Sequence, residues 1–123
     1  MSTYTVISAA STTAATDHKD WGSLSWFASR ALSGTAGLTV GRVRIKAGAN
    51  NPRHAHPNCE EVLYLLDGEL EHTVGNEMVR LRPGDALVVK PNVFHNARSI
   101  GARDADMLVI FSSGDRAFVA EPI

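Results

Sequence analysis

Short runs in which apolar and polar residues alternate recur along most of the chain, and few segments repeat their apolar residues at helical spacing. Alternation is typical of strands, because successive side chains of a strand point to opposite faces of the sheet. Segments such as AGANNP, RPGD and KPN separate the runs and favour turns. The sequence therefore predicts an all-β sandwich or barrel with little helix. The predicted strands are 23–28, 38–46, 61–66, 69–74, 78–81, 86–90 and 107–112.

The chain is long enough for one domain with a real core. It has 123 residues, of which 44% are hydrophobic, and a second domain would have no room. We expect residues 21–123 to form the domain. Residues 1–20, rich in Ser, Thr and Ala, are expected to form an N-terminal arm, either flexible or paired as an edge strand with a partner.

Charge and targeting signals narrow the classes of function. Twelve basic residues stand against thirteen acidic ones, giving a formal net charge of −1, and the basic residues are scattered. This pattern predicts binding neither to nucleic acid nor to a membrane. The first residues match no secretory or transit signal, and the single cysteine, Cys59, cannot form an intramolecular disulfide. We therefore expect a cytoplasmic protein.

The segment RHAHPNCEE, residues 53–61, concentrates groups that could bind a metal. On a strand, the side chains of His54 and His56 would share one face. Glu61 has the same parity as the apolar residues that follow it, so its carboxylate would face the core, whereas Glu60 would face solvent. A buried carboxylate beside two neutral imidazoles favours a divalent metal. The alternative is a solvated charged loop, and these nine residues do not decide between the two.

The same residues resemble the first motif of the cupin superfamily, G-x(5)-H-x-H-x(3,4)-E-x(6)-G. Gly48, His54, His56, Glu61 and Gly68 occupy its fixed positions. Six residues separate Glu61 from Gly68, which is the spacing of the motif and selects this carboxylate over its neighbour.

The segment GDALVVKPNVFHNARS resembles the second cupin motif less closely. Gly84 and His95 match it. Positions that usually hold Pro, Gly and Asn are occupied here by Lys90, Asn92 and Ser99, and a proline follows one place late at Pro91. These departures fall at turns and strand ends and leave the histidine in place. The resemblance spans roughly residues 38–112.

Resemblance to the cupins implies a conical β-barrel with jelly-roll topology that holds one metal near its mouth. It makes His54, His56, Glu61 and His95 the four protein ligands. One divalent transition metal per chain is expected, and Fe, Mn, Ni, Cu and Zn all suit mixed imidazole and carboxylate ligands. Four protein ligands on a six-coordinate ion leave two positions for water, dioxygen or a chelating substrate.

The resemblance implies a function only coarsely, because one fold can host many activities. The leading hypothesis is a small metal-dependent enzyme similar to quercetin-dioxygenase-like cupins, in which a small-molecule substrate binds the metal through its open positions. Glu61 is then the candidate catalytic base. The alternative is a noncatalytic metal-dependent binder or sensor of a small metabolite.

Several other side chains are less specific candidates for the functional site. His72 alternates with apolar residues and is interpreted as a packed or rim histidine. Trp26, Phe94 and Phe111 are candidates for a pocket lining, with the core as the commoner place for an aromatic. Arg42 and Arg44 share a strand face, where they could meet an anionic ligand or pair with acids across the sheet. Tyr64 lies on the opposite face from Glu61.

Exposed apolar residues near the N-terminus predict assembly. The segment 21–32 contains Trp26, Phe27 and Leu32, which is more apolar surface than a lone edge strand of a monomer should expose. We therefore expect a homodimer with this segment in its interface.

Overall fold

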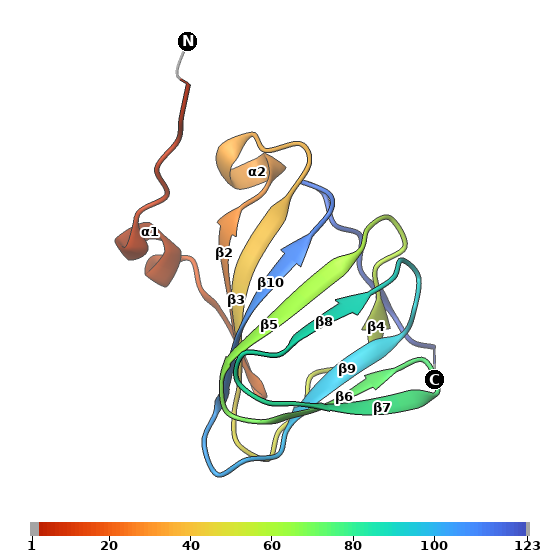
Figure 1. Ribbon diagram of the computed structural model, residues 1–123. Coiled ribbons are helices and arrows are strands. Elements are labelled where there is room, and N and C mark those ends of the chain that lie inside the picture. The colour runs from red at the N-terminus through yellow and green to blue at the C-terminus, as the bar shows by residue number, and fades with distance from the viewer. Residues whose placement is uncertain (1–2, 123) are drawn as a thin grey trace.

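Two antiparallel sheets face each other across the protein, and the computed structural model describes residues 3–122 of the chain (Figure 1). The six-stranded sheet has, in spatial order, β1 (Asp17–Lys19), β2 (Gly22–Ala28), β3 (Thr39–Ile45), β10 (Ala105–Phe111), β5 (Glu61–Asp67) and β8 (Ala86–Val89). The five-stranded sheet has β11 (Val119–Ala120), β4 (His54–Ala55), β9 (His95–Ser99), β6 (Leu70–Val74) and β7 (Glu77–Leu81). This arrangement is the jelly roll that the resemblance implied.

The two helices are short and lie outside the sheets. They are α1 (Ala9–Ala14), which lies beside β2, and α2 (Arg30–Ser33), which follows β2 (Figure 1). Each begins at a serine whose side chain accepts a hydrogen bond from a backbone N–H of the first turn. Among the described residues, no helix is both long and apolar enough to cross a membrane.

The core lies between the sheets and is built from alternate residues of each strand. On β10, Ala105, Met107, Val109 and Phe111 are buried, and the residues between them are half-buried on the outer face. On β5 the buried positions are Glu61, Leu63 and Leu65. Because a strand alternates with period two, the register that buries these leucines also places the carboxylate of Glu61 inside. The parity predicted for this strand is therefore confirmed.

The turn after β5 requires glycine for two reasons. Gly68 has φ +84°, in the left-handed region, and a Cβ at this position would lie 2.8 Å from Cα of Ala105. Any side chain would thus collide with the backbone at the start of β10 as well as strain its own backbone. This glycine ends the first cupin motif, and it fixes where β5 ends relative to β10.

All seven strands predicted from alternation are present, with ends that differ by at most two residues, and the low helix content is also confirmed. Alternation did not reveal the other four strands, β1, β4, β9 and β11, although His54 and His56 were considered on a strand. The inward residues of β9 are His95, Ala97 and Ser99, so the strand carries no large apolar side chain on its buried face. β1 falls within residues 1–20 and pairs with β2.

One argument for the predicted dimer interface is wrong. β2 is not an edge strand, because it pairs with β1 on one side and β3 on the other. Trp26 faces the interior and is partly buried against the core, so most of its ring is directed away from a partner. Of the three residues on which the argument depended, only Leu32 is largely exposed.

Candidate metal centre

Four side chains from three separate segments meet at one end of the space between the sheets. His54 lies on β4, His56 just beyond it, Glu61 at the start of β5 and His95 at the start of β9. One ligand atom from each lies within 4.8 Å of the others, and all four residues are buried. β4 pairs with β9 so that His54 and His95 are direct neighbours. The structure therefore brings together the four residues that the sequence singled out.

Backbone carbonyl groups orient all three imidazoles. Each Nδ1 is hydrogen-bonded to a carbonyl oxygen: His54 to Pro52 at 2.7 Å, His56 to Ala117 at 2.8 Å and His95 to Val93 at 2.8 Å. A carbonyl only accepts, so each Nδ1 carries the proton that it donates. The Nε2 atoms are left to face the shared centre, which is the arrangement that ligating histidines adopt.

The donor atoms fit a metal ion. Nε2 of His56 is fully buried and, among the buried side-chain nitrogen and oxygen atoms of residues 3–122, it alone has no hydrogen-bond partner. It lies 3.4 Å from Oε1 of Glu61, whereas Nε2 of His95 lies 2.9 Å from the same oxygen. An unsatisfied buried nitrogen is costly. Coordination of an ion would satisfy this nitrogen together with the carboxylate.

The protonation states also suit a cation. Burial alone would raise the pKa of Glu61, but the neighbouring imidazoles of His56 and His95 hold it well below its ordinary value. Burial lowers the pKa of His54 to about 4, so this imidazole is neutral at pH 7. Burial also opposes a charge on His95, yet its hydrogen bond to Glu61 raises its pKa. The lowered pKa of Glu61 and the raised pKa of His95 both reflect attraction between a carboxylate and a cation, which is the interaction that a metal ion would supply here.

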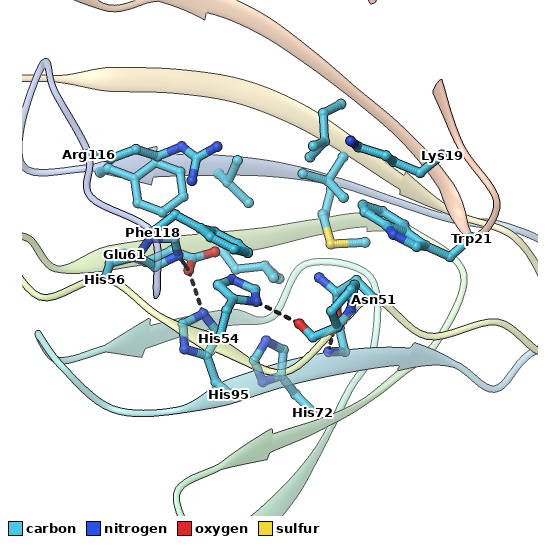
Figure 2. A pocket seen from close by; sticks show the side chains of 18 of the residues that line it. Lys19, Trp21, Asn51, His54, His56, Glu61, His72, His95, Arg116 and Phe118 are labelled. Carbon is cyan, nitrogen blue, oxygen red and sulfur yellow. Dashed lines mark hydrogen bonds and ion pairs between the residues drawn. The ribbon is translucent and has the colours of Figure 1, made fainter. Parts of the chain in front are cut away.

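The four residues form part of the wall of a cavity of about 350 Å³ (Figure 2). His72, buried and stacked on His95 at a centroid distance of 5.7 Å, also lines it. The opposite wall is apolar and includes Trp21, Leu24, Val43, Leu63, Met107 and Val109. An ion held by the four residues would therefore border a space large enough for a small organic molecule.

Two lining residues come from the segment after β10, which the sequence analysis did not single out. Phe118 stacks on His54, with ring centroids 4.7 Å apart and planes at 19°. The guanidinium of Arg116 lies over the ring of Trp26 at 4.4 Å and near that of Phe111 at 5.2 Å. This segment has no motif and little alternation. The only available signal was the presence of an arginine and an aromatic residue close together.

The other candidate residues divide between the cavity and the rest of the protein. Trp26 and Phe111 line the cavity, and Phe94 does not. Cys59 is buried in the core, and burial raises the pKa of its thiol. Arg42 forms an ion pair with Asp106 across the sheet, which is the ordinary alternative to binding a ligand.

A jelly roll that carries three histidines and one carboxylate beside an internal cavity is a cupin-type metal barrel. The chain belongs to the cupin family, because the family model described as "Cupin domain" matches residues 32–111. The four-residue group can hold one transition metal ion per chain.

Several curated relatives with similar sequences come from cereals. A putative germin-like protein 3-4 from Oryza sativa is 31% identical over 97 residues, covering 72% of this chain and 42% of its own length. Oxalate oxidase GF-3.8 from Triticum aestivum is 28% identical over 97 residues, covering 72% of this chain and 43% of its own length. The chain thus spans less than half the length of these relatives.

Solved structures show the same fold. The oxalate decarboxylase of Lactobacillus farciminis superposes with a TM-score of 0.80 at 19% identity, over 85% of this chain and 32% of that one. A structure of an oxalate oxidase superposes with a TM-score of 0.76 at 23% identity, over 85% of this chain and 57% of that one. The oxalate decarboxylase of Bacillus subtilis superposes with a TM-score of 0.80 at 22% identity, over 85% of this chain and 29% of that one. That enzyme has Mn(II) centres.

Proposed function

We propose that the protein is a metal-dependent oxidoreductase whose small-molecule substrate binds the metal through its own oxygen atoms, in a reaction of the dioxygenase type. The observation that carries this proposal is that all four candidate ligands line the cavity. A structural metal site is closed by its protein ligands. Here the four donors lie on one side of an internal space, so open coordination positions of an ion would face that space.

The relatives support redox chemistry at such a centre. Similar curated proteins include oxalate oxidases, and similar folds include an oxalate oxidase and oxalate decarboxylases. Because the chain spans less than half the length of these curated relatives, and the structures are under 25% identical, their substrate is not transferred to this protein.

The chain's own residues have distinct roles in this proposal. A bound transition metal supplies Lewis-acid polarisation of a substrate oxygen and, where the ion is redox-active, access to dioxygen chemistry. The carbonyl groups of Pro52, Ala117 and Val93 keep the three imidazoles in one tautomer. Oε1 of Glu61 is the candidate base that accepts a substrate proton. The apolar wall limits the access of water.

Oxygen uptake tests the proposal. Protein loaded with Fe(II), Mn(II) or Cu(II) is mixed with flavonols, enediols, β-diketones and oxalate, and dioxygen is followed with an electrode. We expect stoichiometric consumption with at least one of these chelating substrates, and none with His56→Ala. Tight binding of such a ligand to the loaded protein without any turnover would contradict the enzyme and favour a metal-dependent binder.

A further inference from the structure

The cavity contains one cationic side chain without a carboxylate partner. Arg116 lines it, and among the hydrogen bonds and ion pairs of residues 3–122 none involves its guanidinium. Six other arginines form ion pairs with carboxylates. The remaining two, Arg82 and Arg98, are exposed to solvent. Arg116 is thus the partly buried arginine whose five N–H donors are unused by the described residues.

Cation–π contacts hold this guanidinium in place. It lies 4.4 Å from the ring centroid of Trp26 and 5.2 Å from that of Phe111. These contacts do not occupy its N–H donors with hydrogen bonds to oxygen, so the donors stay available to a ligand. Both rings also line the cavity. Burial lowers the pKa of Arg116, but a guanidinium stays protonated in proteins. The side chain therefore stays charged, with its orientation set before any ligand binds.

The charges around the cavity are complementary to an anion. Figure 2 shows Arg116 at the end of the cavity that holds Glu61 and His56, and Lys19 near the opposite end. Lys19 is paired with Asp17 at 3.2 Å. With a divalent ion bound, Glu61 neutralises one of its two charges, and Arg116 adds another. The site would then carry about two uncompensated positive charges, one of which a carboxylate can offset.

The size and polarity of the cavity indicate the chemical character of the rest of the ligand. A volume of about 350 Å³ corresponds to roughly a dozen water molecules at about 30 Å³ each. Oxalate alone would leave most of this space to water against an apolar wall that includes Trp21, Leu24 and Met107. A ligand with an apolar body would fill it and remove that wall from water.

We propose that Arg116 is the anion-binding residue of the cavity, and that the ligand is a carboxylate with an apolar body which also offers oxygen atoms to the metal. The inference deepens the proposed function and rests on it, because the same cavity receives the substrate. Arg116 determines specificity by charge, because it binds the carboxylate of the ligand. The apolar wall of the cavity selects for the apolar body.

Binding measurements on the metal-loaded protein test this inference without any assay of turnover. The probes are 4-methyl-2-oxopentanoate, its uncharged methyl ester and oxalate, titrated by calorimetry into protein loaded with Mn²⁺. The two tryptophans of the chain, Trp21 and Trp26, both line the cavity, so their fluorescence gives a second readout. The variants are Arg116→Gln and, as the matched control, Arg103→Gln, which removes an exposed arginine outside the cavity.

We expect the wild-type protein to bind the oxo acid at least tenfold more tightly than either the ester or oxalate. Arg116→Gln should weaken binding of the oxo acid at least tenfold and leave the affinity of the ester unchanged, and Arg103→Gln should behave as wild type. Arg116→Met, a straight apolar chain, replaces the glutamine variant if that one fails to fold. Equal affinities of the wild type and the folded Arg116 variant for the oxo acid would overturn the proposal, as would no binding of the oxo acid at millimolar concentration.

Metal content, measured on every sample, separates this inference from the proposed function. A wild-type protein that retains no Mn²⁺ contradicts both. One Mn²⁺ per chain in wild type and in Arg116→Gln, with unchanged affinity for the oxo acid, contradicts only the role of Arg116.

Discussion

At the scale of single residues, the site depends on which side of a strand each donor faces. Glu61 is 6% exposed and Glu60 is exposed, although the two are adjacent and chemically identical. His54 and His56 are both buried at the site, as their spacing predicted, although His56 lies just beyond β4 and Ala55 between them is buried too. This part of the site could be predicted from the sequence, because it needs only the period of a strand and the spacing of a motif.

The adjacent carboxylates give a direct comparison. Glu61→Gln should weaken metal retention at least tenfold, because it removes the charge that Nε2 of His56 and His95 face. Glu60→Gln, on the solvent side, should bind metal as wild type does. Retention is measured by competition with a chromophoric chelator. Equal losses in the two variants would mean that the inward carboxylate has no special role in binding.

His72 should make the metal-free protein sensitive to acid. Burial lowers its folded-state pKa from 6.5 to about 4, beside His95 and in the field of Glu61. Between these values the unfolded state binds more protons, so the stabilisation is complete above about pH 6.5 and is lost as the pH falls toward 4. His72→Gln should reduce this loss by on the order of 2–3 kcal/mol, at about 1.4 kcal/mol per pKa unit.

Urea unfolding of chelator-treated protein at pH 7 and pH 4.5 measures the difference for His72. The control is His18→Gln, at an exposed histidine of β1, which should keep the pH dependence of the wild type. An unchanged loss of stability in His72→Gln would show that another group accounts for it.

At the scale of elements, prediction from sequence succeeded where strands carry apolar side chains on their buried face, as β5 and β10 do. It missed β9 because the inward face of that strand holds a histidine, an alanine and a serine. It missed Arg116 and Phe118 because their places depend on how the segment after β10 returns to the metal site. The carbonyl of Ala117 bonds to His56, 61 residues earlier in the chain. No local pattern encodes a contact of that range.

The glycine after β5 gives a prediction for an element boundary. Gly68→Ala should destabilise the protein more than Gly48→Ala, its matched control. Both positions have positive φ, at +84° and +82°, so both variants incur about 1–2 kcal/mol of backbone strain. Only at Gly68 would the new Cβ also meet the backbone of Ala105, whereas Gly48 has open space around it. Equal free energies of unfolding in urea for the two variants would contradict the predicted collision at Gly68.

At the scale of the whole molecule, the outer face of the six-stranded sheet is apolar at one edge. Tyr64 and Leu66 on β5 and Val88 on β8 are each 40% exposed or more. β5 and β8 are paired neighbours, and β8 is the last strand of its sheet. Exposed apolar residues on an edge of this kind favour association with a second sheet.

We therefore keep the prediction of a homodimer and place Tyr64 and Val88 in its interface. Light scattering of the wild-type protein at micromolar concentration should give twice the chain mass of 13.2 kDa. Tyr64→Glu with Val88→Glu should give a folded monomer, because two buried charges would be unpaired at the interface. A wild-type monomer, or a dimer unaffected by both substitutions, would contradict this placement.

The central claim is that His54, His56, Glu61 and His95 hold one transition metal in a barrel that folds without it. The most direct test is elemental analysis of protein purified without chelator and then dialysed against a divalent metal, for wild type and for His56→Ala. We predict about one ion per wild-type chain and none in the variant, with the same β-rich circular dichroism in both, because the apolar core supplies most of the stability. Less than about a tenth of an ion per wild-type chain after dialysis, or equal metal content in the variant, would contradict the claim.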